Sequence, residues 1–277
     1  MDILELLKVI ILGIVEGITE WLPISSTGHM VLIEELIKFN ASEEFRNMFR
    51  VVIQLGAILA VVVLYFGKLN PLSPSKSAKA RYLTFILWFK IIIACLPAAM
   101  LGFLIDDWID DHLYNGFVIS MALIIYGVLF IMIENSHKKR ADGITNVYSI
   151  DYQTALFIGF FQVLSLIPGT SRSGATIIGG MILGASRAVS AEFSFFLGIP
   201  IMFGASLLKL VKFGFNYTTA EIIYLLVGML TAFIISIFSI SFLLNWVKKH
   251  DFKFFGYYRI ALGIIVLVWY FVFFIIN

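Results

Sequence analysis

Six stretches of this chain are each long and apolar enough to cross a lipid bilayer. They cover roughly 46–67, 82–104, 114–134, 188–212, 220–245 and 257–276. A helix needs about 20 apolar residues to cross the hydrocarbon layer. Charged residues make up 14% of the chain, against roughly 25% in soluble domains. We therefore expect an all-α polytopic membrane protein that forms one integral domain, residues 1–277.

Two simpler observations exclude other classes. The formal net charge of +2 is too small to suggest a nucleic-acid partner. The single cysteine, Cys95, excludes an intrachain disulfide.

Two further apolar regions, 3–38 and 152–185, are each interrupted by a polar cluster rich in proline, glycine and serine. Each half is too short to cross the bilayer. Broken backbone at membrane depth is tolerated only where protein buries it or where it lines a wet cavity. We interpret both regions as re-entrant helix hairpins. The alternative is one spanning helix followed by an interfacial helix.

The distribution of charge predicts an orientation. Segments 68–81, 137–140 and 248–259 are rich in Lys and Arg, whereas the connection 104–113 carries four aspartates and neither Lys nor Arg. Cytoplasmic loops carry the excess of positive charge. The three basic segments are therefore expected in the cytoplasm, and both termini outside. The first hairpin then enters from outside, and the second from the cytoplasm.

A weak internal repeat gives the same topology. Gly13, Glu16, Ser25 and Gly28 correspond to Gly159, Gln162, Ser171 and Gly174, each 146 residues later. Repeat one covers about 1–135, repeat two about 152–277, and a cytoplasmic linker about 136–151. Each repeat is a hairpin plus three transmembrane helices, and because three is odd the second repeat is inverted. Inverted repeats with broken helices place their site near the midplane.

Glu16 and Glu20 lie one helical turn apart, so they share a helix face. Two such carboxylates can hold a divalent cation together with substrate phosphate, or one of them can act as a general base. The plainer interpretation is two glutamates near a helix end that face water. Gly13 and Gly17 have a spacing typical of close helix packing.

The cluster that follows Pro23 contains Ser25, Ser26, Thr27, Gly28 and His29. Exposed amides in a Gly/Ser turn bind anions. A serine and a histidine three residues apart can form a nucleophile–base pair if the turn brings them together. Alternatively, the hydroxyls only cap the next helix and the histidine is structural.

Arg172 is the strongest local signal, since it stands inside Thr-Ser-Arg-Ser-Gly between two apolar helices. An arginine can donate two parallel hydrogen bonds to a phosphate, and the amides at the start of the following helix add further donors. The alternative is an arginine that caps a helix or snorkels to the surface. Gln54, Gln162 and Glu192 favour contacts between helices, and Lys90 is expected to snorkel or to pair.

At these residues the chain resembles the bacitracin-resistance family of undecaprenyl-diphosphatases. The matching pieces are Glu16-x-x-x-Glu20, Leu22-Pro23-x-Ser25-Ser26-Thr27-Gly28-His29, Ile53-Gln54-Leu55-Gly56-Ala57 and Pro168-Gly169-Thr170-Ser171-Arg172-Ser173-Gly174-Ala175-Thr176. They follow the family's order, and the resemblance covers the whole chain. Arg50 departs from the pattern, because the family has an acid there.

The resemblance implies hydrolysis of undecaprenyl diphosphate to undecaprenyl phosphate and phosphate. This reaction recycles the lipid carrier for peptidoglycan synthesis and confers resistance to bacitracin, which sequesters the diphosphate and so competes for the substrate. The resemblance also implies a divalent cation, Mg²⁺ or Ca²⁺, and a place in the bacterial plasma membrane with an active site that is reached from the outer face.

The residues fit this chemistry, since phosphoryl transfer depends on positioning and on neutralising phosphate charge. We expect Ser26 or a water to attack, His29 to move the proton, and Arg172 and a metal held by Glu16 and Glu20 to neutralise charge. Glu20 thus also belongs to the catalytic group. The predicted phosphate-binding residues are Ser25, Thr27, Gly28, Gly169, Thr170, Ser171, Arg172, Ser173 and Thr176.

Other classes make different demands on the residues. A transporter or flippase of a phosphorylated polyprenyl lipid uses the same anion site without hydrolysis, and phosphate release separates the two. The acid-phosphatase-like lipid phosphatases need a histidine after Ser171-Arg172, and the next one is His250. A purely structural protein has no need of Arg172 at depth. The sequence leaves a homodimer possible.

Overall fold

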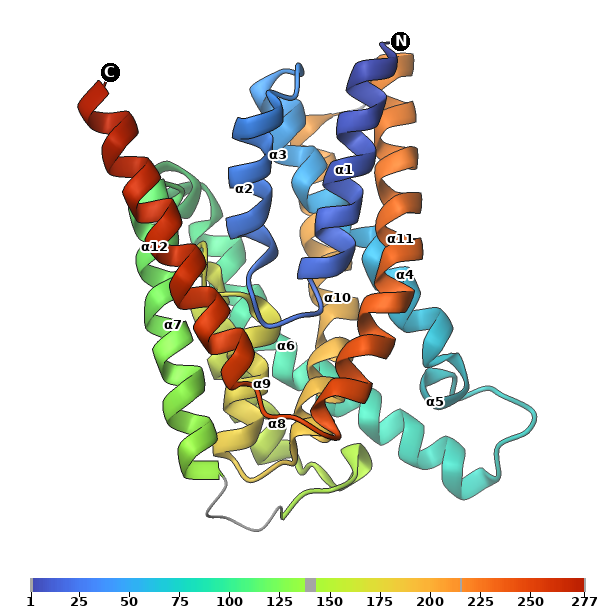
Figure 1. Cartoon of the computed structure of the whole chain (residues 1–277). Helices are drawn as coiled ribbons and strands as arrows, with labels where there is room; N and C mark the ends of the chain where they lie inside the picture. The colour runs from blue at the N-terminus through green and yellow to red at the C-terminus, as the bar shows by residue number, and fades with distance from the viewer. Residues whose placement is uncertain (1, 138–142, 215, 277) are drawn as a thin grey trace.

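The computed structural model describes residues 2–137, 143–214 and 216–276, which form an α-helical bundle (Figure 1). The first half contains α1 (Ile3–Thr19), α2 (Ser26–Ile37), α3 (Glu43–Val52), α4 (Gln54–Leu64), α5 (Phe66–Leu69), α6 (Ala78–Leu113) and α7 (Gly116–His137). The second half contains the short 3₁₀ helix η1 (Val147–Ser149), α8 (Tyr152–Val163), η2 (Leu164–Leu166), α9 (Arg172–Ile182), α10 (Arg187–Phe213), α11 (Thr219–Val247) and α12 (Lys253–Ile276).

Six helical stretches of the described residues are long and apolar enough to span a membrane. They are Glu43–Leu64, Ala78–Ile105, Gly116–Ser136, Arg187–Phe213, Thr219–Val247 and Lys253–Val272. Each coincides with one predicted span, which confirms the all-α polytopic membrane fold. The first span is two helices, α3 and α4, because the helix is interrupted at Ile53, whose amide still bonds to Phe49 O.

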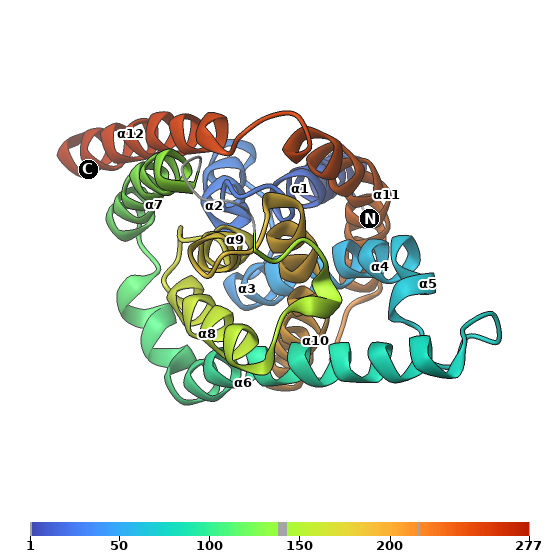
Figure 2. The same cartoon turned by 90° about the horizontal axis from the view of Figure 1, so that it is seen from below.

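Two helix pairs turn back inside the bundle, as the polar clusters predicted. Helices α1 and α2 run in from the end where both chain termini lie, and α8 and α9 run in from the opposite end (Figure 1). Seen along the bundle, α2 and α9 lie near its centre, with α6, α7, α11 and α12 around them (Figure 2). The two repeats themselves, and the division of the chain between them, stay a prediction.

The predicted acidic connection 104–113 is wrong as a loop, because α6 continues to Leu113. Residues 103–114 contain neither Gly nor Pro, so nothing in the chain ends the helix before Asn115-Gly116. The basic segment 248–259 is also shorter than predicted, since α12 begins at Lys253. Residues 138–142, with the basic cluster of the predicted linker, lie outside the described residues.

Glycines bring the first hairpin against a spanning helix. A Cβ atom added at Gly13 would lie 2.8 Å from the carbonyl oxygen of Gly228, and one at Gly17 would lie 2.8 Å from that of Ala232. Helices α1 and α11 therefore touch backbone to backbone, which close packing of small residues makes possible. On the second hairpin, a Cβ at Gly159 would lie 2.3 Å from Ala94 O of α6.

Candidate active site

The turns of the two hairpins have the same unusual backbone. Ser25 has φ 75° and ψ 99°, and Ser171 has φ 73° and ψ 120°. Each serine caps the following helix, since its hydroxyl accepts from the amide of Gly28 (3.3 Å) or of Gly174 (3.1 Å). Positive φ is costly for a residue with a Cβ. The same strained cap at positions 146 residues apart means that both turns present their helix amino termini in the same way.

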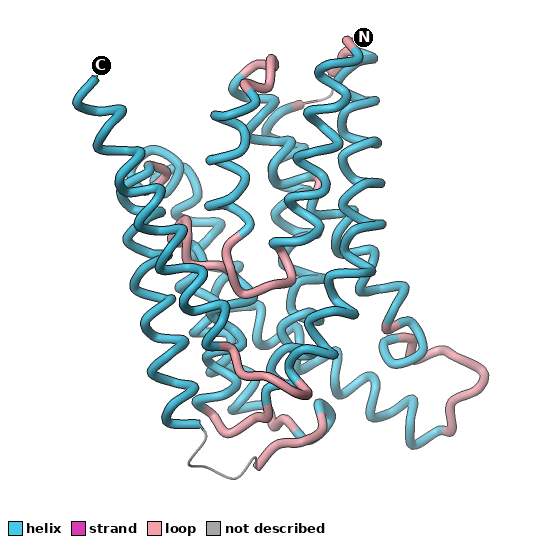
Figure 3. The backbone as a smooth tube through the Cα atoms, in the orientation of Figure 1, coloured by secondary structure: helices cyan, strands magenta, loops and turns pink. Residues whose placement is uncertain are grey.

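Glu20, Ser26 and Arg172 form one connected cluster. The backbone tube shows the two hairpin turns within the bundle as loop segments (Figure 3). Ser26 Oγ donates to Glu20 Oε2 at 2.7 Å, and Arg172 Nη2 donates to Glu20 Oε1 at 3.0 Å. Glu20 and Ser26 are buried, and the side chain of Arg172 is 9% exposed. Two polar segments that are far apart in sequence thus share one carboxylate.

The position of Arg172 is fixed by further contacts. Its Nη1 donates to Ser194 O of α10 at 2.6 Å, and its guanidinium lies 5.8 Å from the ring centroid of Trp21. Trp21 is fully buried and packs edge-on against Phe195 at 5.3 Å. A guanidinium held on one side by a carbonyl and on another by an aromatic face keeps its orientation when its carboxylate partner changes.

Ser173 joins the two turns directly. Its Oγ donates to Glu20 O at 3.0 Å, lies 3.4 Å from Leu22 O, and is 3.1 Å from Ser171 Oγ. Because the Glu20 side chain also accepts from Ser26, Ser26 and Ser173 lie close together although they come from different hairpins.

The other predicted phosphate-binding residues differ in whether a protein group already bonds to them. Thr176 Oγ1 donates to Ser194 Oγ at 2.7 Å. Thr27 and Gly28 lie in the first turn of α2, and Gly169 has φ 92°. The hydroxyl of Thr170 is buried and has no hydrogen-bond partner among the described residues.

Glu16 lies one turn before Glu20 on α1 and is 1% exposed. Its Oε1 has no hydrogen-bond partner within the described part of the chain. A buried carboxylate oxygen without a partner is costly unless a cation or a donor satisfies it. Glu16 and Glu20 are hard oxygen ligands of the type that Mg²⁺ and Ca²⁺ prefer, so the pair fits a divalent cation that also binds substrate phosphate.

His29 is bonded to groups other than Ser26. Its Nδ1 lies 2.7 Å from Ser25 O, and its Nε2 lies 2.7 Å from the hydroxyl of Tyr258 on α12. The two rings are stacked at 5.6 Å. A neutral ring that donates from Nδ1 to the carbonyl accepts a hydrogen bond from the tyrosine hydroxyl at Nε2. In this conformation Ser26 contacts Glu20, and His29 ties the first turn of α2 to α12.

Arg259 is a site residue that the sequence analysis placed in a cytoplasmic loop. It lies within α12 and is fully buried. Its guanidinium donates to Pro23 O at 3.2 Å, and to Gly169 O and Thr170 O at 2.9 Å each. One side chain thus holds the carbonyls of both turns. Its position two residues inside the predicted span 257–276 was the signal, because an intramembrane charge indicates function by default.

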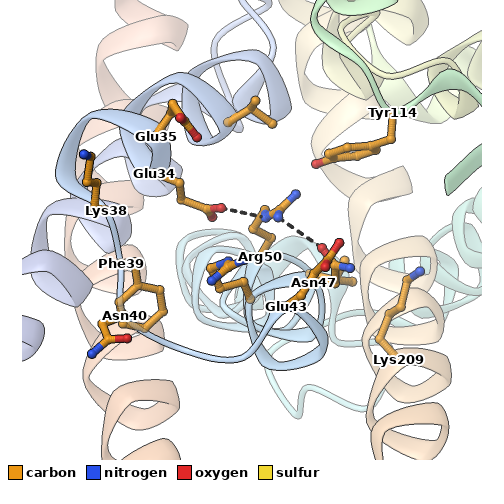
Figure 4. Close-up of a pocket in the computed structure, with 13 residues that line it drawn as sticks. Glu34, Glu35, Lys38, Phe39, Asn40, Glu43, Asn47, Arg50, Tyr114 and Lys209 are labelled. Carbon is orange, nitrogen blue, oxygen red and sulfur yellow. Dashed lines mark hydrogen bonds and ion pairs between the residues drawn. The ribbon is translucent and has the colours of Figure 1, made fainter. Parts of the chain in front are cut away.

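A polar cavity of about 740 Å³ is lined mainly by α2, α3 and the connection between them (Figure 4). These segments lie toward the end of the molecule that carries the termini (Figure 1). Arg50 sits inside it, with Nε 3.0 Å from Glu34 Oε2, Nη2 3.0 Å from Asn47 Oδ1 and its guanidinium 5.3 Å from the ring of Tyr114. The buried acid Glu34 thus gives the unexpected Arg50 a partner. Helix α2 carries both Glu34 and Ser26, eight residues or about 12 Å apart.

Comparison with known proteins decides the family. A family model described as bacitracin resistance protein BacA matches residues 9–265. The chain belongs to this family. A relative from Enterococcus faecalis named undecaprenyl-diphosphatase is 58% identical over 97% of this chain and 98% of its own. Relatives with the same name from Acetivibrio thermocellus (58% identical, 96% of this chain and 98% of its own) and Lachnoclostridium phytofermentans (60% identical, 96% and 97%) match equally fully.

Proposed function

We propose that this chain is an undecaprenyl-diphosphate phosphatase, which hydrolyses undecaprenyl diphosphate to undecaprenyl phosphate and phosphate. The observation that carries the proposal is the buried Glu20–Ser26–Arg172 cluster at the meeting point of two helix amino termini. The family and the shared name of its relatives point to the same reaction. The product is the lipid carrier for cell-wall synthesis, and its recycling removes the diphosphate that bacitracin sequesters.

Phosphate recognition falls to Arg172 and the two turns. The guanidinium can fork onto two phosphate oxygens, and the amides at the starts of α2 and α9 favour negative charge. The positive charge of Arg172 already pairs with the Glu20 carboxylate. When a diphosphate binds, the arginine exchanges this carboxylate for phosphate oxygens. This exchange releases Glu20 for proton transfer.

Ser26 is the proposed nucleophile and Glu20 its base. Ser26 Oγ already donates to Glu20 Oε2 at 2.7 Å, within reach for proton transfer. Oγ gives its proton to Glu20 and attacks the terminal phosphorus, the bridging P–O bond breaks, and undecaprenyl phosphate leaves with the proton from Glu20. Water then gives a proton to Glu20 and attacks the phosphoserine, the bond between phosphorus and Ser26 Oγ breaks, phosphate departs, and Glu20 returns the proton to Oγ. Direct attack by water on the diphosphate is the competing route.

His29 keeps a proposed proton-transfer role, with a condition that its contacts impose. Its Nε2 faces Tyr258, so a proton passed to or from the reacting oxygens requires the imidazole to leave that contact. Its second function is to hold Ser25, and thereby the strained cap.

Glu16 and Glu20 are the residues that would hold a divalent cation, as the partnerless Oε1 of Glu16 supports. When bound, the cation supplies charge neutralisation to the phosphate oxygens. Glu16 would then act only as a ligand of the cation, whereas Glu20 would also accept the proton of Ser26.

The proposed orientation places both termini and the cavity of Figure 4 outside, and the site open to the outer face of the bacterial plasma membrane. The connections 65–77 and 248–252 lie at the end opposite the termini (Figure 1), and the positive-inside rule assigns this basic end to the cytoplasm.

The orientation can be tested with single cysteines in a Cys95→Ser background. Asp111→Cys, at the end of α6 near the termini, should react with an impermeant thiol reagent in intact cells. Ser75→Cys, in the basic connection, should be protected until the cells are opened. The reverse labelling would overturn the proposed access from outside.

The reaction is tested by phosphate release from a long-chain prenyl diphosphate by the purified protein. We expect release that falls in the presence of a chelator and returns on addition of Mg²⁺ or Ca²⁺. Binding of the lipid without release of phosphate would favour a transporter of phosphorylated polyprenyl lipid. Gel filtration coupled to light scattering tests the possible homodimer.

A further inference from the structure

A second cavity lies at the end of the molecule opposite the termini, where α11 passes into α12. Its volume is about 480 Å³. It is lined by Arg187, Trp246, Val247, Lys248, Lys249, His250, Asp251 and Phe254. None of these residues belongs to the two catalytic turns.

The cavity carries an excess of positive charge. Three of its lining residues are Lys or Arg, and one is an acid. Lys248 and Lys249 are exposed, and neither side chain has a hydrogen bond or ion pair to any described residue. Arg187 forms an ion pair with the fully buried Glu134, which accepts from its Nε at 2.9 Å and from its Nη2 at 2.6 Å. The two lysines are therefore available to an anion.

An aromatic surface continues from the cavity along the exposed side of both helices. Trp246 stacks on His250 at 4.2 Å and packs against Phe242 at 5.7 Å and Phe254 at 5.5 Å. Phe242 and Phe254 are 50% and 58% exposed. Tryptophan typically lies at the level of lipid headgroups, and exposed phenylalanines at the next turns of the helices offer a surface for hydrocarbon chains.

We propose that this cavity binds the phosphate headgroup of an anionic glycerophospholipid. Lys248 and Lys249 contact the headgroup, and its acyl chains lie along Phe242 and Phe254. Basic pockets between transmembrane helices on the cytoplasmic side are suited to such headgroups. A free phosphate ion would use the lysines but gain nothing from the aromatic surface. A zwitterionic lipid would use the surface but carry no net charge to the lysines.

The site is connected to the catalytic turns through α12. Glu134 Oε1, besides holding Arg187, accepts from the amide of Phe252 at 2.9 Å, just before α12 begins. Arg259, six residues after Lys253, holds both turns. A lipid that orders the junction of α11 and α12 therefore also steadies the helix from which Arg259 reaches the site.

The test measures lipid binding to the purified protein in neutral detergent by native mass spectrometry and by the rise in Tm. The probes are phosphatidylglycerol, phosphatidylcholine and inorganic phosphate. We expect phosphatidylglycerol alone to bind and to raise Tm. The variant Lys248→Gln/Lys249→Gln should bind it about 10-fold more weakly, since each lysine near an anionic headgroup contributes measurably. The matched control Lys79→Gln/Arg81→Gln removes two exposed charges at the same end and should bind within about 2-fold of wild type.

Three results would overturn the proposal. Equal binding of phosphatidylglycerol by the Lys248/Lys249 variant and the wild type would remove the site. Equal binding of phosphatidylcholine would leave only an apolar contact. Displacement of phosphatidylglycerol by millimolar inorganic phosphate would indicate a pocket for free anions. All of these readouts are independent of hydrolysis.

Discussion

The two hairpins share a backbone and differ in the chemistry they carry. Ser25 and Ser171 have nearly equal φ, cap their helices in the same way, and are followed three residues later by glycine. The first hairpin supplies two carboxylates and a serine hydroxyl, whereas the second has Gln162 at the position of Glu16 and Arg172 at that of Ser26. One backbone arrangement thus holds the proposed nucleophile in one hairpin and the arginine proposed to bind phosphate in the other.

The largest effect is expected at the proposed nucleophile, Ser26 of the first hairpin. Ser26→Ala removes the attacking oxygen and leaves the cap at Ser25 intact, so phosphate release should fall by about 10³-fold or more. Binding of a prenyl diphosphate should persist, as measured by equilibrium dialysis. Turnover at a substantial fraction of the normal rate would make water the nucleophile and reduce the first turn to a binding element.

Arg172→Lys tests the corresponding position of the second hairpin. The charge stays, but lysine cannot donate to Ser194 O, Glu20 and phosphate in fixed directions as the guanidinium does. We expect kcat/KM to fall by about 100-fold, which corresponds to about 2.7 kcal/mol of transition-state stabilisation. Steady-state kinetics near wild type in the lysine variant would show that the second hairpin supplies only charge.

Glu16→Gln makes the first hairpin resemble the second, which has a glutamine there. We expect activity to fall by about 10-fold and the concentration of Mg²⁺ or Ca²⁺ needed for half-activation to rise. Glu20→Gln should shift the titration in the same direction and lower activity further, because Glu20 also serves Ser26. Unchanged metal titrations in both variants would leave the carboxylates a role in proton transfer alone.

Gln162→Leu is the matched control for Glu16→Gln. Neither amide atom of Gln162 has a hydrogen-bond partner among the described residues, so an apolar side chain of similar size should cost little. Activity within about 2-fold of wild type is the expected result. A large loss of activity would mean that the second hairpin contributes Gln162 to the site in addition to the charge of Arg172.

The smallest effect concerns the shared backbone. Ser25→Gly and Ser171→Gly each relieve a positive φ that costs about 1 kcal/mol or more and lose a cap hydrogen bond, for which glycine substitutes at a cost of a few tenths. Because these changes oppose each other, both variants should keep Tm within a few degrees of wild type in thermal unfolding. A large shift in only one variant would show that the two turns are not equally strained.

The turns and spans could be predicted because the information is local. Pro23, Gly169 and the serines specify a break in an apolar run whatever surrounds it, and hydropathy alone locates the six spans. The partner of Ser26 could not be predicted in this way. His29 is close in sequence, but the cap at Ser25 directs its ring to Tyr258, and Glu20 takes the serine hydrogen bond.

Other contacts depend on which helices become neighbours. Arg259 reaches both turns only because α12 lies beside them. Lys90, expected to pair or to snorkel, donates to Tyr148 O at 2.9 Å. Glu192, expected to join helices, pairs with Lys68. For Lys90 and Glu192 the residue type indicated a polar contact, whereas the partner depended on packing that the spacing of residues does not encode.

The close fit of Gly13 and Gly17 against α11 has a consequence for how the protein assembles while it is synthesised. The ribosome makes α1 first and α11 only about 200 residues later. Until then the helix that carries both carboxylates lacks the surface against which it docks, and Arg172 and Arg259 also belong to the later half. The proposed active site can therefore be completed only late in synthesis, and a nascent chain released before α11 lacks the surface against which α1 docks.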